Sequence, residues 1–214
     1  MKNVTLILLL IFVLGCKEKS KKKETNNDLI ENIENTGEVL TGVNMLNEIT
    51  SFRNVAVTFS ETKEFFSGEP IYLLSRDQSD SKSSYAQTEK VDVQYAETYR
   101  ASVIVKKGET GNLFGLRIQG NYPDRVDAVF DLDKGAVVGV QKTQDFEEEK
   151  ANIEALSDGW FICSVTAEVG ADKVVVFFGP TMGKKSIDSW THKTGHMCNA
   201  YFVPSSIKLQ KVTN

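Results

Sequence analysis

The sequence predicts an all-β protein in which two antiparallel sheets stack into a sandwich. From about residue 42 onward, apolar and polar side chains alternate in many short segments, and this alternation is typical of strands with one buried face. Clusters of Gly, Asn, Asp and Pro separate these segments and indicate turns. No amphipathic helices are interleaved with them, which disfavours the α/β classes and leaves an antiparallel sandwich.

The expected strands can be read along the chain in order. They lie in NVAVTFSE (54–61), EPIYLLSR (69–76), EKVDVQYAETYRASVIVKKG (89–108), NLFGLRIQG (112–120), DAVFDLDKGAVVGV (127–140), GWFICSVTAEV (159–169), DKVVVFFGP (172–180) and NAYFVPSSIKLQ (199–210). A turn at residues 133–135 divides the fifth segment into two strands, because Gly135 tolerates a positive φ. The one helix-like stretch is DFEEEKANIEAL (145–156), which is short and polar. A Greek-key or jelly-roll path suits this number of strands.

The chain begins with a segment typical of an exported lipoprotein. An apolar run from Val4 to Leu14 is too short to span a membrane, which requires about 20 apolar residues, and it has the length of a signal-peptide core. The following VLGC fits the lipobox pattern of bacterial lipoproteins. This resemblance implies a signal peptide at 1–15 and lipidation, including palmitate, at Cys16. The alternative is an ordinary secretory signal with a chance cysteine.

Composition divides the rest of the chain into a tether and one domain. Residues 16–41 are rich in Lys, Glu and Asn, cannot bury enough apolar surface to fold, and are expected to form a flexible tether. Residues 42–214 form the expected sandwich domain. The formal net charge of −4 argues against nucleic acid as a partner. The sequence leaves the oligomeric state open.

Three segments carry a family resemblance. The matching framework residues are Tyr99, Ser102, Val105, Lys106 and Gly108, then Phe130, Asp131, Leu132 and Gly135, then Gly159, Trp160, Cys163 and Val165. In this order they resemble jelly-roll domains of the carbohydrate-binding-module type, which recur in phage tail proteins and bacterial polysaccharide-binding proteins. The resemblance covers about residues 90–210 and departs from the family in the last strand, FVPSSIKL. It implies a jelly-roll fold and carbohydrate as a partner; its framework motifs indicate fold more than function.

Two cysteines remain in the domain. In a strand, Cys163 shares a face with Phe161 and Val165, so it is expected to behave as a small core residue rather than a nucleophile. Export would permit a disulfide between Cys163 and Cys198, and two buried thiols are the alternative.

Two groups of residues are candidates for carbohydrate binding. The first lies in MGKKSIDSWTHKTGHMCN (182–199), where Trp190 offers an aromatic platform and His192, His196 and Asn199 offer polar groups. The second is an outward sheet face with Arg100, Arg117 and Gln119, extended by Tyr122, which suits an anionic polysaccharide. For both groups the alternative is structural: Trp190 covers the core, and the charged face is merely solvated.

No cofactor can be assigned from the sequence. The aspartates at 124, 127, 131 and 133 offer oxygen ligands for a structural Ca²⁺, but they lack the closing Glu of a calcium loop, and turn formation explains Asp131 and Asp133 better. We therefore expect a non-catalytic, carbohydrate-binding lipoprotein of the bacterial cell envelope, anchored in the outer membrane. The alternatives are a protein-interaction or adhesion lipoprotein on the same fold and, less favoured, a jelly-roll polysaccharide lyase or hydrolase.

Overall fold

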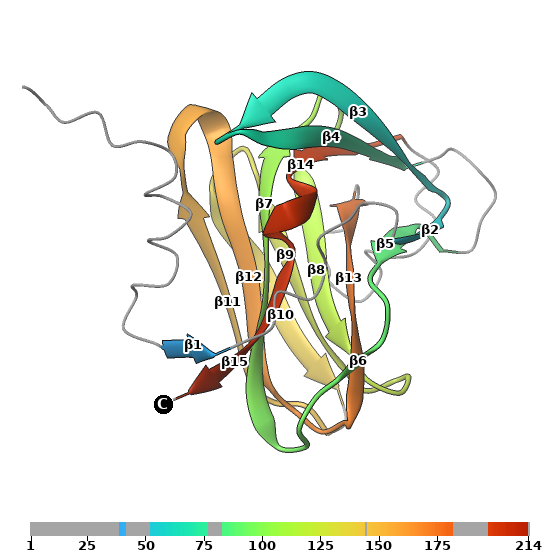
Figure 1. The fold of residues 1–214 in the computed structure, drawn as a ribbon, viewed down its shortest axis with the longest axis vertical. Helices are drawn as coiled ribbons and strands as arrows, with labels where there is room; N and C mark the ends of the chain where they lie inside the picture. Colours follow the sequence, from blue (N-terminus) through green and yellow to red (C-terminus); the bar gives the residue numbers. More distant parts are fainter. Residues whose placement is uncertain (1–38, 42–51, 77–82, 144, 182–196, 214) are drawn as a thin grey trace, which may run out of the picture.

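The computed structural model describes residues 39–41, 52–76, 83–143, 145–181 and 197–213. Within these ranges the regular structure is strand and two single-turn 3-10 helices, and the strands form two antiparallel sheets (Figure 1). The predicted all-β class and the two antiparallel sheets are therefore confirmed. The signal peptide, Cys16, nearly all of the tether, and Trp190, His192 and His196 lie outside the described residues.

Sheet A has eight strands centred on β7. These are β1 (Val39–Thr41), β3 (Val57–Phe66), β4 (Glu69–Arg76), β7 (Glu97–Lys107), β11 (Glu147–Ala155), β12 (Trp160–Val169), β14 (Asn199–Phe202) and β15 (Lys208–Thr213). One edge of β7 pairs with β12, which pairs with β11. The other edge is shared by β14, which leads to β4 and β3, and by β15, which leads to β1. The 3-10 turn η4 (Pro204–Ser206) joins β14 to β15.

Sheet B has seven strands. These are β2 (Arg53–Val55), β5 (Tyr85–Gln87), β6 (Val91–Asp92), β8 (Leu113–Gln119), β9 (Arg125–Asp131), β10 (Ala136–Thr143) and β13 (Lys173–Thr181). Their order is β10-β9-β8-β13, after which β5 and β6 pair with different parts of β13 and β2 pairs with β5. The predicted division of 127–140 into two strands is confirmed, with Gly135 at φ +59° in the turn.

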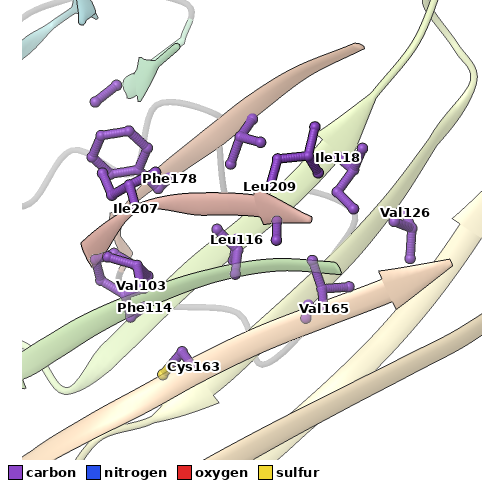
Figure 2. Packing of buried hydrophobic residues seen from close by; sticks show 14 of the residues in the cluster. Val103, Phe114, Leu116, Ile118, Val126, Cys163, Val165, Phe178, Ile207 and Leu209 are labelled. Atoms are coloured by element: carbon purple, nitrogen blue, oxygen red, sulfur yellow. The ribbon is translucent and has the colours of Figure 1, made fainter. Parts of the chain in front are cut away.

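The core lies between the two sheets and is built from alternate residues of the long strands. On β8 the buried inner side chains are Phe114, Leu116 and Ile118. On β12, Cys163 and Val165 belong to the same buried cluster, as Figure 2 shows. Cys163 is thus a core residue as predicted, and burial raises the pKa of its thiol well above the usual range, which makes it a poor nucleophile.

The predicted disulfide alternative is wrong, because both cysteines are buried free thiols. Cys163 lies opposite Val103 of β7, whereas the carbonyl of Cys198 accepts a hydrogen bond from the backbone N–H of Arg76 on β4. Strand β7 lies between β12 and β14, and Ala200, two residues after Cys198, lies opposite Lys107, four residues along β7 from Val103. The two cysteines are therefore separated by more than about 10 Å, both across and along the sheet. A disulfide requires Cα atoms within about 7 Å.

The helix-like interpretation of 145–156 is also wrong, since residues 147–155 form the edge strand β11. Ala151 and Ile153 pack against the core cluster, while Lys150, Asn152 and Glu154 are exposed. This alternation has a period of two, as in a strand, and the backbone of β11 pairs with β12. The run of Glu and Lys has helix propensity, but the apolar residues at 151 and 153 would lie on different faces of a helix.

Candidate functional site

The predicted site residues are distributed over both sheets. Arg117 and Gln119 lie on β8 of sheet B, and Tyr122 lies in the loop that follows it. Arg100 lies on β7 of sheet A. The prediction that Arg100 and Arg117 share one sheet face is therefore wrong. Arg117, Gln119 and Tyr122 do lie close to one another, at one end of sheet B.

An ion-pair network occupies the outer face of sheet B. The register places Arg117 of β8 directly opposite Asp127 of β9. The Nε and Nη2 atoms of Arg117 donate to the two carboxylate oxygens of Asp127, a bidentate contact. The Nε of Arg125 donates to Oδ2 of the same carboxylate at 2.8 Å. Because the side chains of Arg117 and Asp127 are only 8% and 2% exposed, this contact is a buried ion pair.

Aromatic and amide groups border this network. The guanidinium of Arg117 lies 5.7 Å from the ring centroid of Phe177 on β13, within cation–π range. Phe177 makes an edge contact with Tyr85 at 4.8 Å between centroids. Nη1 of Arg117 also donates to Oε1 of Gln119 at 3.3 Å. The guanidinium of Arg117 is thus held in place by Asp127, Phe177 and Gln119.

The most exposed large apolar side chain of the described residues stands at the end of this network. Tyr122 is 78% exposed in the loop between β8 and β9. The guanidinium of Arg125 lies 5.9 Å from the centroid of its ring. Nη1 of Arg125 donates to the carbonyl oxygen of Pro123 at 3.2 Å. Asp127 and Pro123 therefore hold this guanidinium beside an accessible aromatic ring.

A second exposed tyrosine belongs to the same end of the sandwich. Tyr95 is 62% exposed in the loop between β6 and β7. This loop is tied to the turn after β12 by a hydrogen bond from the N–H of Val93 to the carbonyl of Asp172. The Tyr122 loop contacts the same turn so closely that a Cβ at Gly120 would lie 2.8 Å from that of Ala171. We call the loops 93–96, 120–124 and 170–172 the tyrosine end.

Asn199 and Arg100 lie away from the tyrosine end. Oδ1 of Asn199 accepts a hydrogen bond from the N–H of Thr110 at 3.0 Å, and its backbone N–H donates to the Thr110 carbonyl at 2.9 Å. This contact anchors the loop that precedes β8, whereas Tyr122 lies in the loop that follows β8. Nε of Arg100 donates to Oγ1 of Thr166 at 3.2 Å on the outer face of sheet A.

Of the four aspartates considered for Ca²⁺, three have side chains engaged with protein groups, namely Asp127, Asp131 and Asp133, which pairs with Lys107. Asp127 pairs with the two arginines. Oδ1 of Asp131 accepts hydrogen bonds from Asn112 and from the backbone N–H groups of residues 133 and 134, and Oδ2 pairs with Lys134. Burial alone would raise the pKa of Asp131, but these hydrogen bonds outweigh it and lower the pKa. Within the described ranges, no group of three or more His, Cys, Asp or Glu side chains is placed to hold a metal ion.

Arg125 and Asp127, on the strand that follows the Tyr122 loop, carry signals that the sequence reasoning missed. Arg125 and Asp127 are two apart in a strand and therefore share a face, as do Arg117 and Gln119 in the preceding strand. A short loop joins the two strands, and this signal could have been used to predict antiparallel pairing of their charged faces. Tyr95 gave no comparable signal, because alternation in 91–105 is interrupted at Ala96, which has φ +57°.

The arrangement offers a ligand two kinds of contact. An exposed aromatic ring stacks against the C–H face of a sugar, and an oriented guanidinium donates hydrogen bonds to hydroxyl or carboxylate oxygens. The chain matches no protein-family model, and no curated protein matches it in sequence. In the described part of the chain, no helix combines the length and apolar character needed to span a bilayer.

Proposed function

We propose that this protein is an envelope-anchored lipoprotein whose sandwich captures a poly- or oligosaccharide at the tyrosine end, without catalysis. The observation that carries the proposal is the 78% exposed ring of Tyr122 next to the guanidinium of Arg125. Lipidation of Cys16 behind a cleaved signal peptide would hold the domain at the membrane, with residues 16–41 as its tether.

Preorganisation favours Arg125 as the polar partner of the sugar. Its Nε and Nη1 are held by Asp127 and Pro123, so little side-chain freedom is lost when a ligand binds the guanidinium. Tyr122 presents a ring that needs no rearrangement to stack. Tyr95, on the other side of the 170–172 turn, supplies a second platform for a longer chain.

The strand order supports a jelly-roll path for the sandwich. Strands β4, β14 with β15, β7 and β12 follow one another across sheet A, and β5 with β6, β13, β8 and β9 follow one another across sheet B. When β5 and β6 are counted as one strand and the inserted strands β10 and β11 are left out, the chain from β4 to β14 alternates between the two sheets except at the β8–β9 hairpin. This alternation is the path of a jelly roll. Binding sugars on loops or sheet faces is compatible with this architecture.

A glycan-array screen of the intact protein tests the proposal. We expect binding to one class of glycan, at least about tenfold weaker binding in Tyr122→Ala, and retained binding in Tyr122→Phe, which keeps the ring. Arg125→Gln should weaken binding similarly. Phe65→Ala is the matched control, because Phe65 is a 68% exposed ring on β3, away from the tyrosine end. Absence of binding to all glycans, or equal loss in the Phe65 variant, would overturn the proposal.

One observation favours protein interaction as the second candidate function. Strand β3 is at an edge of sheet A and carries the exposed ring of Phe65. Exposed edges with apolar side chains can pair with a strand of another protein. The lyase or hydrolase hypothesis gains no support from Arg100 and Arg117, because clustering of these two residues in a cleft would have favoured it and they lie in different sheets.

A further inference from the structure

Strand β3 forms a long edge of sheet A. It pairs with β4 alone, through residues 57–61 and again through residues 65 and 66. Figure 1 shows it running along the outside of the β3–β4 hairpin. Across the described ranges, no backbone group of β3 has a backbone partner other than in β4. An edge of ten residues is long, and it offers its outward backbone groups to another strand.

A bulge in β3 shows which backbone groups point outward. Oγ1 of Thr62 bridges the bulge: it donates to the carbonyl of Ile71 on β4 at 2.9 Å and accepts the N–H of Glu64 at 3.1 Å. The N–H of Glu64 therefore points toward β4. Successive residues of a strand point their N–H and C=O groups to opposite edges. The backbone groups that face away from β4 are therefore those of residues 61, 63 and 65.

The sequence of this segment is complementary to itself. In FSETKEF, Thr62 is central, Glu61 and Lys63 flank it, and a Phe stands at each end. When two copies pair antiparallel about a two-fold axis at Thr62, Glu61 of one copy lies opposite Lys63 of the other, and Phe59 lies opposite Phe65. Opposite charges and aromatic rings in these cross-strand positions stabilise a sheet.

Charge selects this register over its neighbours. Both cores lie on the same side of a joined sheet only when the axis passes through a residue, because opposed residues must point to the same face. An axis through Glu61 or Lys63 would place that residue opposite its own copy, with like charges in contact. The axis at Thr62 avoids this and places Glu64 opposite Ser60 of the second copy. This remaining acid gives β3 one more acid than bases, which opposes a tight complex.

The side chains that this register pairs are accessible. Phe65 is 68% exposed, and Glu61 and Lys63 are exposed. Among the described residues, Lys63 forms no ion pair. Glu61 lies opposite Tyr72 on β4, where desolvation and then the charge of this carboxylate raise the pKa of the phenol. A carboxylate accepts several hydrogen bonds, so Glu61 can also bind Lys63 of a second copy.

We propose that β3 is a self-association surface, at which two copies pair their edges antiparallel about Thr62 and extend sheet A across a dimer. A second copy is the partner because the chain itself supplies the complementary acid, base and aromatic rings. Edge pairing buries a small area, so the association is weak in solution. Anchoring of both copies in one membrane, as in the proposed function, raises their effective concentration.

Self-association does not depend on glycan binding. Phe66, at the end of β3, lies 4.9 Å from Trp160 between ring centroids, at the start of β12, whereas the 170–172 loop of the tyrosine end follows the last residue of β12. The two surfaces therefore lie at opposite ends of the sandwich. Binding of a soluble oligosaccharide with a single epitope should be unchanged in Lys63→Glu, so failure of one proposal is distinguishable from failure of the other.

Sedimentation velocity of the intact protein, with detergent micelles in excess, tests the proposal. Over a protein concentration of about 1 to 100 µM we expect a monomer–dimer equilibrium. Glu61→Lys and Lys63→Glu should each weaken it at least about tenfold, because each places like charges opposite one another twice. The exchange variant Glu61→Lys/Lys63→Glu should restore it. Lys90→Glu is the matched control, since it changes the charge equally at an exposed lysine outside β3.

A disulfide trap tests the register. Thr62→Cys should form an intermolecular disulfide under mild oxidation, because the two copies of this residue meet at the axis with Cα atoms about 4.5 Å apart. Ser60→Cys is the matched control on the same strand, and its two copies are offset by about 13 Å along the strands. The native Cys163 and Cys198 are buried and do not compete.

Four outcomes would overturn the proposal. A protein that stays monomeric throughout the concentration range would leave the β3 edge to solvent or to a strand of a different protein. Equal weakening in Lys90→Glu would show that net charge is responsible. An exchange variant that stays monomeric, with unchanged thermal unfolding, would remove the role of the ion pairs. Equally rapid cross-linking of Ser60→Cys and Thr62→Cys would contradict the register.

Discussion

Arg100 and Arg117 occupy comparable positions and have different environments. Each lies on a central strand, β7 of sheet A or β8 of sheet B, and each points away from the shared core. Opposite Arg117 on the neighbouring strand is the carboxylate of Asp127, and the pair is buried. Opposite Arg100 are Thr166 and Gln210, which are polar but uncharged. On the outer face of sheet B the arginine lies opposite a carboxylate, whereas on the outer face of sheet A the residues directly opposite the arginine are uncharged.

This difference shows that cross-strand neighbours determine the role of a charged residue in a sheet. A buried arginine with a bidentate carboxylate is part of the scaffold, and removing one partner leaves the other charge in a poorly solvated place. A half-buried arginine whose directly opposite residues are uncharged keeps contact with water, so the loss of one hydrogen-bond partner should cost less. The following predictions test this contrast, beginning with the largest expected effect.

Asp127→Ala should be the most damaging change on either outer face. It removes the carboxylate that binds both Arg117 and Arg125, and Arg117 stays buried. We expect a loss of about 3–5 kcal/mol in the free energy of unfolding, measured by urea denaturation. The control is Asp133→Ala, which breaks the exposed pair with Lys107 and should cost less than about 1 kcal/mol.

The double variant Arg117→Met/Asp127→Ala sharpens this result. Removing both charges avoids a buried charge without its counterion, so the double variant should be more stable than Asp127→Ala alone. A double variant as unstable as the sum of two single variants would show that the two side chains act separately.

The free energy of unfolding should fall in acid when Asp131 becomes protonated. The hydrogen bonds to Asp131 lower its pKa in the folded protein, so its ionised form stabilises the fold. This contribution is fully present above its unfolded-state pKa of about 3.9 and is lost as pH falls through the lowered folded-state value. Asp131→Asn should therefore cost about 1–2 kcal/mol at neutral pH and progressively less in acid. Unfolding free energies measured between pH 7 and pH 2 check this.

The position of Asp131 makes hydrogen exchange a second measurement. Its carboxylate organises the β9–β10 turn, so acid should increase exchange of those amides before it affects β7 and β12 in sheet A. Simultaneous loss of protection in both sheets would contradict a role confined to this turn.

Much of the fold was predictable because strand alternation is a local property. Segments such as 113–119 and 160–169 show one buried face within a few residues, and their strands were predicted closely. The edge strand β11 was missed because its charged residues have helix propensity, and tertiary pairing with β12 overrides it. The register was not predictable, since it depends on contacts between distant segments.

The candidate site was only partly predictable for the same reason. Arg117, Gln119 and Tyr122 were identified as polar or aromatic residues of one strand and its loop. Arg100 was grouped with them because a sequence shows which face of a strand is polar but not which sheet the strand joins. The partner of Arg117, the carboxylate of Asp127, was considered only as a metal ligand, although the short loop between their strands predicted their pairing.

Thr166→Val should have a modest effect on sheet A. It removes the acceptor for Nε of Arg100, at 3.2 Å, while preserving side-chain volume. Arg100 is half-buried and can turn to solvent, so we expect a loss of no more than about 1 kcal/mol in thermal or urea unfolding. A loss as large as that of Asp127→Ala would show that Arg100, too, is part of the scaffold.

Ser102→Ala should have the smallest effect, because it removes a hydroxyl that has no hydrogen-bond partner among the described residues. We expect stability within about 0.5 kcal/mol of the parent protein. Ser206→Ala is the matched control: the Ser206 hydroxyl accepts the N–H of Ile104 at 2.8 Å and donates to the carbonyl of Val203 at 2.6 Å. Its removal leaves a buried backbone N–H unpaired and should cost about 1–3 kcal/mol. If Ser102→Ala were equally costly, its hydroxyl would have a structural role on the outer face of sheet A.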